Sequence, residues 1–82
     1  MSAERDGEVI RLMGDCPAGD AETLLALLQQ EPGLGVDVTE AGGLHTAVVQ
    51  VLLALRPAVR GELRDPFLNH WIRPLLPEPS PR

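Results

Sequence analysis

The feature that most constrains this chain is the run from Leu44 to Leu55, which is apolar on nearly every side. Only His45, Thr46 and Gln50 interrupt it with polar side chains. A helix that is hydrophobic all round has to be covered on most of its surface. Since a chain of 82 residues can close only one core, the rest of the sequence must supply that cover. The run therefore predicts a largely buried helix inside a layered domain.

The residues before this helix alternate between two kinds of pattern. Residues 8–13 (E-V-I-R-L-M) and 34–38 (L-G-V-D-V) are short and β-branched, which favours strands. Between them, apolar residues at 21, 24, 25 and 28 have the spacing of an amphipathic helix, with Asp20 as the expected N-cap. Residues 39–43 (T-E-A-G-G) have the composition of a tight loop.

The residues after the buried helix predict one more strand and one more helix. Residues 58–63 can form a third, edge strand, and Asp65-Pro66 is a strong helix start. An apolar stripe then predicts that the helix docks on the core with Trp71 buried. We expect residues 1–76 to form a single domain and residues 77–82 (P-E-P-S-P-R) a flexible tail. The stripe consists of Phe67, Leu68, Trp71, Ile72 and Leu75.

This order of elements predicts an α/β fold, with a small sheet of about three to four strands and helices packed on it. Right-handed crossovers would make residues 36–38 the central strand. Its neighbours would be the strands at 9–13 and near 59–63.

The charge and aromatic content exclude nucleic acid as the main ligand. The chain has twelve acidic residues, seven arginines and no lysine, for a net charge of -5, and its only aromatic residues are Phe67 and Trp71. A nucleic-acid protein needs a basic surface and, for single strands, aromatic stacking faces. The charge is also uneven, because residues 56–82 hold five of the seven arginines. Such asymmetry can steer a partner or a second copy of the chain.

Compartment and membrane association follow from two further observations. The single cysteine, Cys16, cannot form an internal disulfide, and no apolar leader follows the charged start M-S-A-E-R-D-G-E. The longest apolar run is much shorter than the roughly 20 residues of a bilayer crossing. We expect a cytoplasmic protein with no membrane span.

No motif in the sequence indicates catalysis, a metal or another cofactor. A nucleophile and base could come only from Cys16, His45, Asp15 and Asp37, and these match no known arrangement. His45 and His70 have no further ligand at metal-binding spacing. We expect a protein that is not an enzyme and that carries no cofactor or metal.

Residues 36–55 (V-D-V-T-E-A-G-G-L-H-T-A-V-V-Q-V-L-L-A-L) resemble the signature of the STAS domain family, the sulphate-transporter and anti-sigma-factor-antagonist domains. That signature is a strand, Asp-Leu-Ser, a loop, Asp-Ser-Ser/Thr-Gly and an apolar helix. Residues 7–16 are similar to the family's opening strand. Asp37 matches the aspartate after the strand, and Thr46 matches the phosphorylated Ser or Thr. His45 replaces an aspartate and Val48 a glycine.

The resemblance implies a short, diverged STAS-like domain that acts as a protein-protein interaction module in bacterial-type signalling. Thr46 would be the phosphorylation site, and Asp37, His45, Thr46 and Gln50 would contact a partner such as a kinase-like anti-sigma factor. Two alternatives remain open from the residues alone. Thr46 can simply cap its helix while Gln50 is solvated, or the chain can be an assembly subunit that homo-oligomerises through its helix faces.

Overall fold

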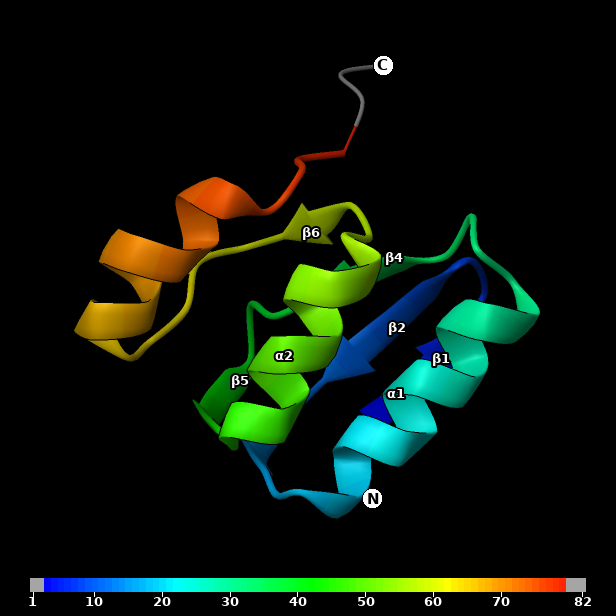
Figure 1. Cartoon of the computed structure of the whole chain (residues 1–82), viewed down its shortest axis with the longest axis horizontal. Helices are drawn as coiled ribbons and strands as arrows, with labels where there is room; N and C mark the ends of the chain where they lie inside the picture. Colours follow the sequence, from blue (N-terminus) through cyan, green and yellow to red (C-terminus); the bar gives the residue numbers. More distant parts are fainter. Residues whose placement is uncertain (1–2, 80–82) are drawn as a thin grey trace.

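The computed structural model describes residues 3–79 and contains two small sheets and three helical segments (Figure 1). Two helices, α1 and α2, are α-helical, and the third segment, residues 66–75, is here called the C-terminal helix. It opens with one helical turn and continues as the π-helical turn η1 (Leu68–Ile72) and the 3-10 turn η2 (Arg73–Leu75). The other elements are β1 (Ala3–Asp6), β2 (Val9–Leu12), β3 (Gly14–Cys16), α1 (Gly19–Gln30), β4 (Gly35–Asp37), β5 (Ala41–Leu44), α2 (Thr46–Leu55) and β6 (Val59–Arg60).

The main sheet has the strand order β1-β2-β4-β6. β4 lies in the centre and is parallel to both neighbours, with Ile10 opposite Val36 on one side and Val59 opposite Val36 on the other. All three side chains are fully buried. The predicted α/β class, the central strand and its two neighbours are therefore confirmed.

The sequence pattern did not predict β1, which forms an antiparallel hairpin with β2. Its sequence, A-E-R-D, is mostly charged, and only Ala3 is buried. The hairpin forms because Gly7 adopts a left-handed φ of 65° at the turn, which glycine tolerates at little cost. Arg5 also forms an ion pair with Glu31, just after α1.

The predicted loop at 39–43 is wrong in its second half, because residues 41–44 form strand β5 parallel to β3. Glycine makes this pairing possible: a Cβ on Gly42 would lie 2.7 Å from Asp15 Oδ1. The same Asp15 oxygen accepts a hydrogen bond from the Gly43 N–H at 3.0 Å. The two short strands bring Cys16 next to the start of α2.

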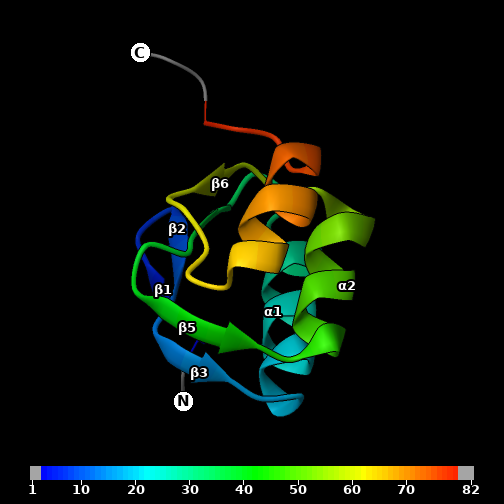
Figure 2. The same ribbon diagram turned by 90° about the vertical axis from the view of Figure 1, so that its left-hand side faces the viewer.

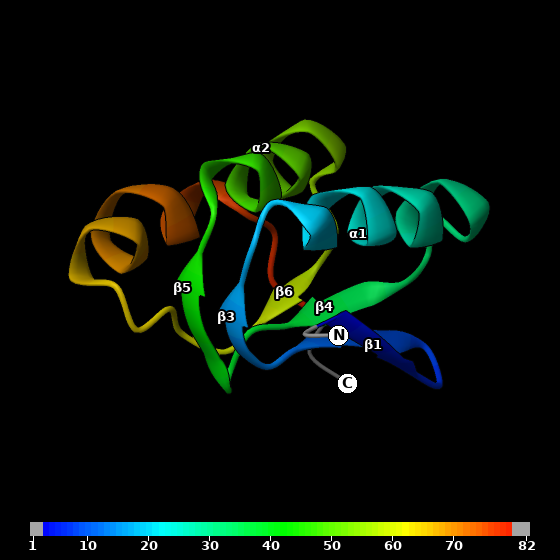
Figure 3. The same ribbon diagram turned by 90° about the horizontal axis from the view of Figure 1, so that it is seen from below.

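All three helices cover one face of the main sheet (Figures 2 and 3). α2 lies between α1 and the C-terminal helix, and the core fills the space between helices and sheet. Asp20 is not the N-cap of α1 as predicted; Ala18 occupies that position, and Asp20 is buried in the first turn. The buried apolar side chains that α1 and α2 contribute are Ala21, Leu24, Leu28, Val48, Val49 and Leu52.

The C-terminal helix begins as predicted, since Asp65 Oδ1 accepts the N–H of Phe67 at 2.8 Å. The prediction that Trp71 is buried is wrong, because 61% of this residue is exposed. The helix turns a neighbouring stripe to the core instead, with Leu68 and Ile72 packed against it and Leu76 buried just beyond.

Arg73 ties the C-terminal helix to the edge strand β6. Its guanidinium donates to Gly61 O at 2.8 Å and to Val59 O at 2.7 Å. The Val59 N–H donates to Pro77 O at 2.8 Å, so the predicted tail starts in contact with the sheet. Residues 80–82 of that tail lie outside the described residues. Within residues 3–79, no helix is both long enough and apolar enough to cross a membrane.

Candidate functional site

The start of α2 carries two of the four residues that the sequence singled out, His45 and Thr46. His45 is the N-cap: its Nδ1 accepts the N–H of Ala47 at 3.0 Å. Its backbone N–H donates to Cys16 O at 2.9 Å, which fixes the helix start to β3. Capping therefore belongs to His45, and the alternative in which Thr46 caps the helix is wrong.

Thr46 is the first residue of α2 and is exposed. It lines a hollow of about 390 Å³ between α2 and the C-terminal helix. Asp65 and the exposed Phe67 line the same hollow from the opposite side. The Thr46 side chain is thus accessible beside an apolar wall and one carboxylate. The remaining lining residues are Leu44, Val49, Leu68 and Ile72.

Gln50 is also exposed, and it lies one turn after Thr46 on the solvent-facing side of α2. It borders a groove of about 370 Å³ between α1 and α2, together with Ala54 one turn later. The predicted polar stripe along α2 is therefore divided between two hollows, because residues four apart drift around the helix by about 40° per step.

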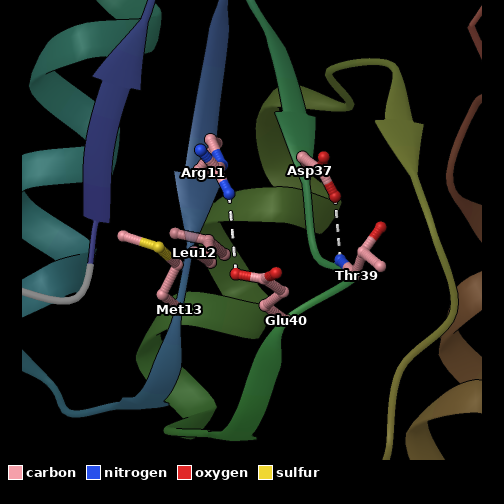
Figure 4. Close-up of a pocket in the computed structure, with 6 residues that line it drawn as sticks. All are labelled: Arg11, Leu12, Met13, Asp37, Thr39 and Glu40. Carbon is pink, nitrogen blue, oxygen red and sulfur yellow. Dashed lines mark hydrogen bonds and ion pairs between the residues drawn. The ribbon is translucent and has the colours of Figure 1, made fainter.

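Asp37 lies apart from the α2 start, in a polar pocket of about 120 Å³ at the carboxyl ends of β2 and β4 (Figure 4). Its Oδ1 accepts the Thr39 N–H at 2.8 Å. Hydrogen bonds from Thr39 hold the pKa of Asp37 below its ordinary value of 3.8, and Arg60 and Arg11 add to the effect. Arg11 also forms an ion pair with Glu40 at 3.5 Å across this pocket. Asp37 is thus a locally paired carboxylate that shares no hollow with Thr46.

The backbone of Cys16 is hydrogen-bonded to the backbone of His45. The Cys16 side chain, however, is buried. Burial, together with the smaller effects of the Asp20 and Asp15 carboxylates, raises the pKa of the Cys16 thiol to about 11. A thiol with such a pKa stays protonated at neutral pH and is a weak nucleophile. In the part of the chain from residue 3 to residue 79, no three His, Cys, Asp or Glu side chains gather as a metal site would require.

Sequence reasoning missed the most exposed apolar feature of the surface, which lies on the C-terminal helix. Phe67, Trp71 and Leu75 are exposed by 62%, 61% and 51%. The spacing of four residues between them is visible in the sequence. In the sequence pattern, however, these three residues and the neighbouring core-facing residues form a single stripe. A surface carrying Trp and Phe in this way is typical of a contact site for another protein.

Comparisons of this chain with protein-family models, with curated proteins and with solved structures find no match.

Proposed function

We propose that this protein is a protein-interaction module of bacterial-type cytoplasmic signalling, resembling an anti-sigma-factor antagonist, and that it docks a regulatory protein at the start of α2. The observation that carries the proposal is the position of Thr46, exposed at a helix N-terminus and on the wall of a partly apolar hollow. His45 and Phe67 lie beside it and would contribute to the contact.

Phosphorylation of Thr46 would act as the switch. A phosphate adds about -1.5 to -2 charges at neutral pH. The N-terminus of α2 favours a negative group, so the fold would tolerate the modification. The hollow, however, already contains the Asp65 carboxylate and would become strongly acidic. A partner that docks there with an apolar or acidic surface would then be repelled.

The partner of this proposal is a kinase-like regulatory protein of the anti-sigma type, which would recognise the unmodified Thr46 and phosphorylate it. Asp37 would not belong to the same contact, because it lines a separate pocket. Gln50 would lie at its margin, since it is one turn along α2 and borders the α1–α2 groove rather than the hollow beside Thr46. The proposal therefore rests on His45 and Thr46 more than on the other two residues.

The test compares the parent chain and three variants of it as baits in extracts of the native organism, with and without ATP. Thr46→Val keeps the shape of the side chain and removes the acceptor hydroxyl, whereas Thr46→Glu adds a charge. Gln30→Glu adds the same charge at an exposed position near the end of α1 and serves as the matched control.

We expect the parent chain, Thr46→Val and Gln30→Glu to capture the same kinase-like protein, and Thr46→Glu to lose it. ATP should release that protein from the parent and Gln30→Glu but not from Thr46→Val. Thermal melts should show that Thr46→Glu is folded, because an acid in the first helical turn is tolerated or slightly favourable. Equal capture by Thr46→Glu and the parent would place the interface elsewhere.

A further inference from the structure

The C-terminal helix exposes three large apolar side chains to solvent, Phe67, Trp71 and Leu75, which together are called the ridge. They are spaced four residues apart along this helical segment. His70 packs edge-on against Trp71, with ring centroids 4.8 Å apart, so the indole has a neighbour that can hold its orientation. The ridge has the form of a helix face that inserts into a groove.

The same chain contains a groove of matching character between α1 and α2. This groove measures about 370 Å³ and is mostly apolar, and small side chains along it leave room for larger ones. The residues that line it are Ala21, Glu22, Leu25, Ala47, Gln50, Val51 and Ala54.

We infer that this protein forms a homodimer in which the Phe67–Trp71–Leu75 ridge of each copy occupies the α1–α2 groove of the other. The C-terminal helix, which carries the ridge, and α1, which forms one wall of the groove, lie on either side of α2 in one helical layer (Figure 3). A two-fold axis that passes near α2 therefore lets both contacts form at once, as a closed symmetric dimer requires. The inference stands independently of the proposed role of Thr46.

The charges of the two surfaces do not oppose this pairing. Glu22 is the single charged residue among those that line the groove. The three ridge side chains are uncharged, and His70 packs against Trp71. The contact therefore brings no two like charges together.

The apolar area is also sufficient for a dimer. A Phe or Trp side chain can bury roughly 150–250 Å², and well over half of Phe67 and of Trp71 is exposed here. Together with Leu75, the exposed apolar area of one ridge is therefore roughly 300 Å². Two ridges and the two grooves that receive them would bury roughly 1,200 Å², the lower bound of a standard stable interface. A single ridge against an unrelated surface would bury only half as much.

The experiment measures sedimentation velocity and tryptophan fluorescence of the full chain from about 1 μM to about 1 mM. Trp71 is the only tryptophan, so its emission reports on the ridge alone. We expect a monomer-dimer transition in this range, with emission moving to shorter wavelength as the dimer forms.

Two variants separate the halves of the contact. Trp71→Glu places an acid on the ridge, where it would meet an apolar groove bordered by Glu22, and Ala54→Arg places a large cation in the groove. Each alone should weaken dimerisation by at least about 30-fold. Both positions are exposed, and circular dichroism melts will verify that the variants fold. Leu55→Glu is the matched control, because Leu55 is exposed next to Ala54 but borders a different hollow.

The decisive measurement mixes the two variants. In a mixed dimer one ridge-groove contact is intact, and in the other the two new charges have opposite sign and face each other. The mixture should therefore dimerise where neither variant does. Its emission should shift as well, and that signal comes only from the Ala54→Arg copy, since the other copy lacks tryptophan. A parent chain that stays monomeric at about 1 mM, a dimer that survives either variant, loss of the dimer in Leu55→Glu, or a mixture that does not associate would overturn the inference.

Discussion

Replacing Arg73 by methionine should destabilise the domain more than any other single change at a half-buried charged position. The guanidinium binds Gly61 O and Val59 O at 2.8 and 2.7 Å, and Leu76 O more loosely at 3.4 Å. Methionine keeps most of the apolar stem but removes every donor. The carbonyl groups would then lose their partners where the C-terminal helix meets the edge of the sheet.

The size of the effect follows from these contacts. A hydrogen bond to a charged group contributes about 1.5–3 kcal/mol, and partial exposure reduces that contribution. Two good bonds and one weak bond therefore give an expected loss of about 2–4 kcal/mol. A domain of 82 residues has a free energy of unfolding of roughly 4–12 kcal/mol, so the loss would be a large share of the total.

Urea denaturation followed by circular dichroism measures this loss directly. With a slope of about 1 kcal/mol per M, the midpoint should fall by about 2 M or more. Arg73→Lys should recover about half of the loss, because one ammonium can serve one carbonyl but not both. A loss below about 0.5 kcal/mol for Arg73→Met would refute the claim that these bonds hold the helix to β6.

Three further predictions concern single positions. Gly61→Ala should cost about 1–3 kcal/mol in the same urea assay, because φ is 96° and the new Cβ would lie 2.5 Å from Thr39 Oγ1 and 2.8 Å from Thr39 N; an unchanged midpoint would contradict this. The lowered pKa of Asp37 should stabilise the fold fully above its ordinary value of 3.8 and lose this effect as the pH falls toward the folded-state pKa. Asp37→Asn should flatten that part of the pH profile, and an identical profile would count against it. Cys16, with its pKa raised to about 11 and its side chain buried, should react with a thiol reagent only on unfolding; rapid labelling of the native protein would show that the thiol is accessible.

The sequence predicted the layered fold because its periodicities are strong. The β-branched residues of β2 and β4 and the apolar length of α2 leave few other arrangements for so short a chain. It could not predict β1, whose charged residues have no strand pattern and whose pairing depends on the turn at Gly7. Nor could it predict β5, where glycines form a strand because the backbone has to approach Asp15 closely.

The sequence predicted the position of His45 and Thr46 in the candidate site, but it did not predict that Trp71 is exposed. Thr46 and His45 lie at the start of α2 as the sequence implied, because an apolar helix that follows a glycine-rich segment has a well-defined beginning. Trp71 was assigned to the core because two stripes, 67/71/75 and 68/72/76, are adjacent and equally apolar. Periodicity alone does not decide which of two such stripes faces inward; Arg73 and the packing of Leu68 decide it here.

The two edges of the main sheet determine how this chain can avoid aggregation. At one edge, β1 is short and exposes Glu4, Arg5 and Asp6, whose charges discourage another strand from adding. At the other edge, the outward N–H of Val59 donates a hydrogen bond to Pro77 O. The Arg73 guanidinium donates to the outward carbonyl groups of Val59 and Gly61. Neither edge is a template for amyloid-like growth, so crowding many copies together should favour finite complexes rather than fibrils.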